Sequence, residues 1–242
     1  MDRRRFIKLC ATATALVASR PATLAATPGP LKPSRPSRLV HDDGTPIAPG
    51  DIEVGRSYVF HYPYLATPCF LIDLGEQVDP TDDLTTEDGQ RYRWQGGTGP
   101  RRSVVAFSAI CAHQMSYPTP TVSFINYRHT PVRYMDVQQR RNERERVIYC
   151  CSEGSAYDPA AGGRVLGGPA RQPLAAVALG YDEDADTFVA TGTYGGDMFE
   201  RFFDKFGFQL SLQHRTDDIR RPVDGSTAVM PLEEYSSSFR QC

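Results

Sequence analysis

Short runs of hydrophobic residues, separated by turn residues, recur through the middle of the chain. They occupy residues 58–62, 69–74, 103–110, 147–149, 174–179 and 187–191. Runs of this length, bounded by proline and glycine, are typical of buried strands. The pattern therefore predicts a mostly β domain over residues 52–192.

Two regions depart from this pattern. Residues 117–146 are polar and rich in arginine, which predicts an insertion between two strands. Residues 193–242 form a C-terminal extension. Within it, residues 197–206 place one methionine and four phenylalanines on roughly one helical face, which favours a helix packed against the core. The residues after 213 are polar, and we expect them to be irregular.

The N-terminus carries a pattern typical of export. A basic segment with Arg3 and Arg4 precedes a short apolar stretch that ends near residue 18. This order is the signature of a signal peptide, and the arginine pair followed by Phe6 resembles a twin-arginine signal. We expect residues 1–26 to be this signal and the Pro-rich residues 27–51 to be a linker.

Composition and charge narrow the function. The 242 residues include 27 Lys and Arg against 29 Asp and Glu, a formal net charge of −2, which argues against a nucleic-acid partner. Six cysteines are too few for a disulfide-rich scaffold of this length. No run approaches the length of a spanning helix, so membrane association would depend on an uncleaved signal.

Candidate metal ligands follow two of the expected strands. Cys111 and His113 come directly after the run 103–110, and Cys150-Cys151-Ser152-Glu153 follows the run 147–149. Two such segments are expected to meet as neighbouring loops at one end of the β structure. A third loop, residues 168–170, follows shortly after.

These motifs resemble those of the Rieske iron–sulfur proteins. The family pattern is C-x-H, a spacer, C-x-x-H, a G-S-x-Y-D run and a G-P-A loop. The chain shows Cys111-Ala112-His113, then Gly154-Ser155-Ala156-Tyr157-Asp158, then Gly168-Pro169-Ala170. The resemblance covers roughly residues 52–192 and is strongest to exported single-domain subunits. It implies an all-β fold, an antiparallel β-sandwich with a small cluster-binding subdomain, followed by the C-terminal helix and tail.

The resemblance also implies a 2Fe–2S cluster held by two cysteines and two histidines. Histidine ligands make such a cluster less negative and raise its reduction potential. Cys111 and His113 match the first pair of ligands. Ser155 and Tyr157 match hydroxyl donors to the cluster sulfurs, and Pro169 matches a residue of the third loop beside it.

The second ligand histidine is missing. If Cys150 is the second cysteine ligand, Glu153 stands at the histidine position. If Cys151 is the ligand, Gly154 stands there. A third option uses both cysteines as ligands. His129 or His214 could supply a replacement, so the sequence leaves the fourth ligand open, and the cluster could be atypically ligated or absent.

The remaining cysteines are not expected to be ligands. Rieske proteins of quinol-oxidising complexes have two further cysteines that join the cluster loops, but Ser116 stands at the first of these positions. We therefore expect no disulfide between the loops. Cys69 lies in an expected strand and should be a small buried residue. Cys242 has no evident partner.

The sequence thus predicts a periplasmic protein that transfers single electrons for a redox partner, such as a cytochrome or a larger oxidoreductase subunit. It would be an electron-transfer component rather than a catalyst. Two alternatives are a Rieske-like fold that lost its cluster and serves as an interaction subunit, and a zinc site built from the cysteines and His113.

Overall fold

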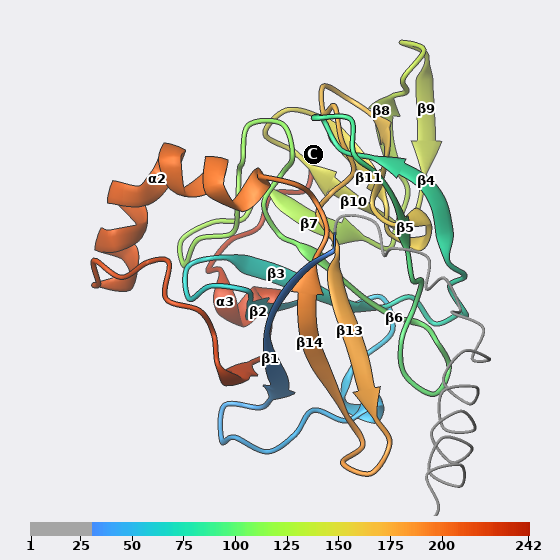
Figure 1. The fold of residues 1–242 in the computed structure, drawn as a ribbon. Coiled ribbons are helices and arrows are strands. Elements are labelled where there is room, and N and C mark those ends of the chain that lie inside the picture. Colours follow the sequence, from blue (N-terminus) through green and yellow to red (C-terminus); the bar gives the residue numbers. More distant parts are fainter. Residues whose placement is uncertain (1–30) are drawn as a thin grey trace, which may run out of the picture.

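The computed structural model describes residues 31–242 and shows a chain folded mainly into antiparallel sheets, with one long helix near the C-terminus (Figure 1). This confirms the all-β fold class. The predicted signal peptide lies outside the described residues, so export stays a prediction.

The first sheet contains four strands. In spatial order they are β13 (Val177–Asp182), β14 (Thr187–Thr193), β1 (Lys32–Val40) and β15 (Gly225–Ala228). The pairing of β1 with β15 is parallel and the other two pairings are antiparallel. The second sheet is antiparallel, in the order β16 (Met230–Pro231), β2 (Tyr58–His61), β3 (Pro68–Asp73) and β6 (Val104–Ser108).

The third sheet carries the candidate ligands and is called the site sheet. Its order is β12 (Arg164–Gly167), β11 (Ser155–Asp158), β10 (Val147–Cys150) and β7 (Ile125–Arg128), all antiparallel. Two hairpins complete the strands: β4 (Thr81–Thr85) with β5 (Arg91–Trp94), and β8 (Val132–Met135) with β9 (Arg141–Arg144). Two short 3₁₀ turns are η1 (Pro49–Asp51) and η2 (Pro159–Ala161).

The second sheet separates two hydrophobic clusters. Phe60 and Leu71 face the first sheet, where they pack with Phe188. On the opposite face, Phe70 and Phe107 join a cluster that contains residues of the site sheet. Because side chains alternate across a strand, β3 can supply both clusters at once. The site sheet is thereby fixed against a sheet that is buried on both faces.

The segment expected to be a linker contains a strand. β1 pairs with β14 through a register shift between Pro33 and Ser37, and it pairs with β15 from Ser37 onward. Pro33 lies at the start of the pairing and Pro36 lies within the register shift, so the missing N–H groups cost few ladder hydrogen bonds. Ser37 and Leu39 are fully buried. The Pro-rich composition predicted a linker, so the short alternation of buried and exposed side chains in β1 was not recognised from the sequence.

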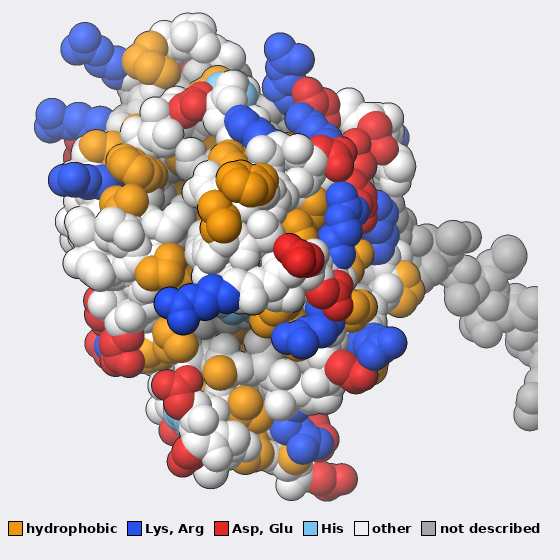
Figure 2. Space-filling model, turned by 90° about the vertical axis from the view of Figure 1, so that its left-hand side faces the viewer, with side chains coloured by type: hydrophobic (Ala, Val, Ile, Leu, Met, Phe, Trp, Pro, Cys, Tyr) orange, Lys and Arg blue, Asp and Glu red, His pale blue; other side chains and the backbone are white. Residues whose placement is uncertain are grey.

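The predicted C-terminal helix is present but longer than expected. α2 (Met198–His214) buries Met198, Phe202 and Phe203 against Ile110 and other residues beside the first candidate loop. Its far end exposes Phe208 and Leu212. Figure 2 views the side of the molecule on which Figure 1 draws α2 and shows hydrophobic patches interspersed with both kinds of charge. Within residues 31–242, no helix has the length and hydrophobicity needed to cross a membrane.

The tail after residue 213 is more ordered than the sequence suggested. It forms β15 and β16, followed by α3 (Leu232–Tyr235). It then runs beside residues 119–126 and ends near the upper part of the site sheet, where C marks the terminus in Figure 1. Its polar composition fits a surface segment held mainly by backbone pairing.

Candidate metal centre

Strand alternation separates the two adjacent cysteines. Cys150 pairs with Ser155 across β10 and β11, and Ile148 pairs with Tyr157. Directly paired residues share a face of a sheet, so Cys150, Ser155 and Tyr157 all point toward the core. Cys151 packs with Tyr149 on the opposite face. The structure thus brings Cys150, not Cys151, to the inner side.

The inner side contains two free, buried thiols, Cys111 and Cys150. The Tyr157 hydroxyl lies 3.3 Å from the Cys111 sulfur and accepts a hydrogen bond of 3.1 Å from the backbone N–H of Ala112. Because the hydroxyl oxygen already accepts this bond, its proton is free to point at the sulfur. We call Cys111, Cys150 and Tyr157 the sulfur end of the site.

The electrostatics of the sulfur end favour negative charge on one sulfur. The pKa of the Cys111 thiol is lowered, first by a hydrogen bond from Cys150 and then by one from Tyr157, against the opposing effect of burial. The pKa of Cys150 is raised because it donates that bond and is itself buried. Burial raises the pKa of Tyr157, so it stays a donor.

Ser155 adds an unpartnered group to this environment. Its side chain is fully buried, and its hydroxyl has no hydrogen-bond partner among the described residues. The hydroxyl nevertheless lies close enough to Cys111 to help lower the pKa of that thiol. A buried hydroxyl without a partner is costly, which indicates a space for an acceptor beside it.

His113 and Glu153 meet at the other end, which we call the surface end. Their side chains are 28% and 27% exposed, and Nδ1 of His113 contacts a carboxylate oxygen of Glu153. The same nitrogen is buried and makes no hydrogen bond within the described part of the chain. The two side chains therefore form a close polar contact, and both are of types that can ligate a metal ion.

Backbone contacts fix the loops that carry these groups. In the first loop, the N–H of Cys111 donates to the carbonyl of Ser116, and the N–H of Met115 donates to the carbonyl of Cys111, both at 2.9 Å. In the second, the N–H of Gly154 donates to the carbonyl of Cys150 at 2.8 Å, with Gly154 at φ +74°. A side chain at position 154 would therefore be strained.

The third loop presses directly against the second. A Cβ atom at Gly168 would lie 2.3 Å from the carbonyl oxygen of Gly154, closer than such atoms approach. Gly168 has φ +81°, which also favours glycine. Its neighbour Pro169 lines the same pocket as Glu153 and Gly154.

Cys151 forms a disulfide with Cys242, 91 residues away, with 5.8 Å between the Cα atoms. The expectation that Cys242 has no partner is therefore wrong. While this bond is intact, Cys151 has no thiolate to offer a metal, so the two ligand hypotheses that used Cys151 conflict with the structure. The expected export could have suggested the pairing, because cysteines of exported proteins that are not ligands tend to form disulfides.

The two histidines considered as replacements lie elsewhere. His214 contacts His61, with ring centroids 5.7 Å apart. His129 packs against Gly55 beyond the end of β7 that is remote from Cys150. Cys69 is fully buried and its thiol donates to the carbonyl of Tyr62 at 3.0 Å, which confirms it as a small core residue.

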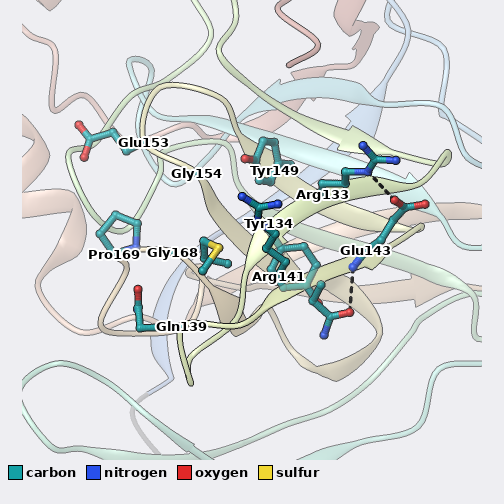
Figure 3. A pocket seen from close by; sticks show the side chains of 12 residues that line it. Arg133, Tyr134, Gln139, Arg141, Glu143, Tyr149, Glu153, Gly154, Gly168 and Pro169 are labelled. Carbon is teal, nitrogen blue, oxygen red and sulfur yellow. Dashed lines mark hydrogen bonds and ion pairs between the residues drawn. The ribbon is translucent and has the colours of Figure 1, made fainter.

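A cavity of about 1120 Å³ opens beside the surface end (Figure 3). The β8–β9 hairpin forms one wall, and Tyr149 and the second and third loops form the rest. Figure 3 shows the Arg133–Glu143 ion pair at one side of this space and Glu153 at the other. The polar insertion of the sequence thus builds a pocket that reaches the candidate metal centre.

Across residues 31–242, no set of three His, Cys, Asp or Glu side chains converges in the way that a single metal ion requires. The four candidate donors instead divide into two pairs, a thiol pair inside and the His113–Glu153 pair outside.

No protein-family model matches this chain. Among solved structures, it is similar to the soluble domain of the Rieske protein II from Sulfolobus acidocaldarius. The two are 29% identical over 57% of this chain and 68% of that one, with a TM-score of 0.41. At a TM-score of this size the likeness carries no argument about function, which rests on the site residues.

Proposed function

We propose that this protein holds a Rieske-type 2Fe–2S cluster between its three loops and transfers single electrons for a redox partner after export to the periplasm. The observation that carries the proposal is the sulfur end: two buried free thiols together with the Tyr157 hydroxyl and the unpartnered Ser155 hydroxyl. A bound cluster would supply a one-electron redox couple.

The donor set fits such a cluster in two halves. Cys111 and Cys150 would hold one iron as thiolates. His113 and Glu153 would hold the other, with the carboxylate in the position of the missing histidine. Ser155 and Tyr157 would donate hydrogen bonds to sulfur atoms, which stabilises added negative charge.

Glu153 sets this site apart from one with two histidines. A carboxylate brings a negative charge that a neutral imidazole lacks, so it disfavours addition of an electron. We therefore expect a reduction potential below that of two-histidine clusters. With a single imidazole ligand, the potential should also depend less on pH.

The surface end gives a route for electrons. His113 and Glu153 are each about one quarter exposed, so a partner such as a cytochrome or a larger oxidoreductase subunit could dock over them. The net charge of −2 gives no reason to expect nucleic acid. The N-terminal signal supports periplasmic export by the twin-arginine route, which delivers proteins already folded around their cofactors.

The test is metal and sulfide analysis of protein exported by its native route, combined with electron paramagnetic resonance after reduction. Two irons and two sulfides per chain, with a signal of the Rieske type, support the proposal. A folded protein free of iron and sulfide contradicts it. Such a protein would favour an interaction subunit, for which the substitution of the ligand histidine by Glu153 is the supporting observation.

A further inference from the structure

The second loop presents two chemically equivalent thiols in sequence, and only one can occupy the inner position. A shift of one residue would exchange Cys150 for Cys151 and would bring Gly154 to the position of Glu153. Such shifts move a side chain to the opposite face of a strand. The β10–β11 register opposes the shifted arrangement, and a covalent bond to Cys151 would oppose it further.

We infer that the Cys151–Cys242 disulfide is this bond, a register lock that retains Cys151 on the outer face so that Cys150 alone serves as a ligand. The inference rests on the proposed function, since it concerns the choice of a cluster ligand. Cys151 and Cys242 are positioning residues here, because neither would touch the cluster.

The backbone around Cys151 supports this role. Its N–H donates to the carbonyl of Phe124 at 2.7 Å, and its side chain packs on the outer face with Tyr149. The disulfide adds a covalent link on the same side. An inward rotation of Cys151 would require both the hydrogen bond and the disulfide to break.

The tail that delivers Cys242 is itself anchored. The N–H of Ser237 donates to the carbonyl of Pro120, and the N–H of Ser123 donates to the carbonyl of Ser238, both at 2.9 Å. Arg240 makes two more contacts: its N–H donates to the carbonyl of Ser123 at 2.8 Å, and its carbonyl accepts from the Asn126 side chain at 3.0 Å.

These contacts run along residues 120–126, the segment that leads into β7, next to β10. The disulfide therefore ties Cys151 to a support that belongs to the site sheet and not to a loose chain end. Because four hydrogen bonds already align the tail, formation of the bond requires little further ordering of the chain.

The chemistry of the lock is simple. After export of the folded chain, the thiols of Cys151 and Cys242 lose two protons and two electrons to a disulfide-bearing oxidant of the receiving compartment, and one S–S bond forms, so the lock retains a ligand arrangement that was made before export. The thiols of Cys111 and Cys150 are not consumed.

Two variants test the lock, because both remove the disulfide but only one leaves a competing thiol. Cys242→Ser frees Cys151 beside Cys150, whereas Cys151→Ser removes the competitor. We expect iron loss to a chelator to accelerate at least about tenfold in both variants, since each loses the covalent support. We expect a second paramagnetic resonance signal only in Cys242→Ser.

The double variant Cys151→Ser/Cys242→Ser should show a single paramagnetic resonance signal. Circular dichroism should show that all three variants are folded. Identical signals in Cys242→Ser and Cys151→Ser would overturn the inference while leaving the cluster intact. A parent protein without iron and sulfide would overturn the proposed function, and the inference with it. Peptide mapping of the parent that finds Cys242 as a free thiol would also overturn the lock.

Discussion

The sulfur end and the surface end of the site differ in burial and in how closely they follow the Rieske pattern. The sulfur end is buried and has every group that the pattern requires, including the hydroxyl donors. The surface end is about one quarter exposed and has a carboxylate where the pattern has a histidine.

This difference has a physical basis. A carboxylate buried without a cation or hydrogen bonds costs several kcal/mol, whereas a carboxylate that reaches water is hydrated. Substitution of a ligand by Glu is therefore tolerable at the surface end but would disrupt the sulfur end. The surface end is therefore the part of the candidate site where a charged replacement costs the fold least.

The largest effect is expected from loss of a thiolate at the sulfur end. Cys111→Ser should reduce bound iron to background, because a hydroxyl is a poor replacement for a thiolate ligand. Iron and sulfide analysis measures this result. The control is Cys69→Ser, which changes a buried free cysteine outside the site and should retain the cluster. Equal iron in the parent and in Cys111→Ser would contradict the ligand assignment.

Acid should weaken the part of the fold around His61, at the end of β2. Burial, and secondarily the neighbouring His214, lower the pKa of His61 to about 4 from an ordinary value of 6.5. Above pH 6.5, the His61 side chain is neutral in both the folded and the unfolded chain. Between pH 6.5 and 4 the unfolded chain binds the proton and the folded chain does not, so stability falls as pH falls.

The shift of the pKa of His61 corresponds to a loss of about 3 kcal/mol in unfolding free energy over this window. Urea unfolding at pH 7.5 and pH 4 measures it. His61→Gln should show a smaller loss than the parent. An equal loss in both proteins would assign the acid sensitivity to other groups.

At the surface end, restoration of the histidine should raise the reduction potential. Glu153→His removes a negative charge from the site, and we expect a rise on the order of 100 mV with a steeper pH dependence. Gly154→His is the matched comparison. Because Gly154 has φ +74°, a histidine there should destabilise the loop by about 1–2 kcal/mol without raising the potential. Redox titration followed by spectroscopy distinguishes the two, and a rise only in Gly154→His would favour the other register.

The smallest effect is expected from a hydroxyl at the sulfur end. Tyr157→Phe removes the donor to Cys111 and leaves the N–H of Ala112 unpaired, which should cost about 1–2 kcal/mol of stability. It should also lower the potential by a few tens of mV, on the order of a single hydrogen bond to sulfur. Tyr149→Phe, on the outer face of the site sheet, is the control and should leave the potential unchanged.

Part of the fold and of the site could be read from local patterns. The runs that became β2, β3, β6 and β10 stand out because apolar β-branched and aromatic residues cluster between turn residues. Cys111 and His113 follow one of these runs directly, so a local motif was enough to identify them. The strand β1 was missed because its prolines predicted a linker. Its short alternation of buried and exposed side chains becomes a stable strand only through pairing with β14.

The sequence by itself determined the residue types of the site: the thiols, one imidazole, the hydroxyl donors, and a carboxylate or glycine in place of the second histidine. Only the tertiary structure placed Cys150 on the inner face of the site sheet and Cys151 on the outer face. Adjacent residues are equivalent in sequence, and their separation to opposite faces exists only once β10 pairs with β11. The partner of Cys151 likewise depended on the path of a tail 91 residues away, because distant contacts are set by packing and not by local pattern.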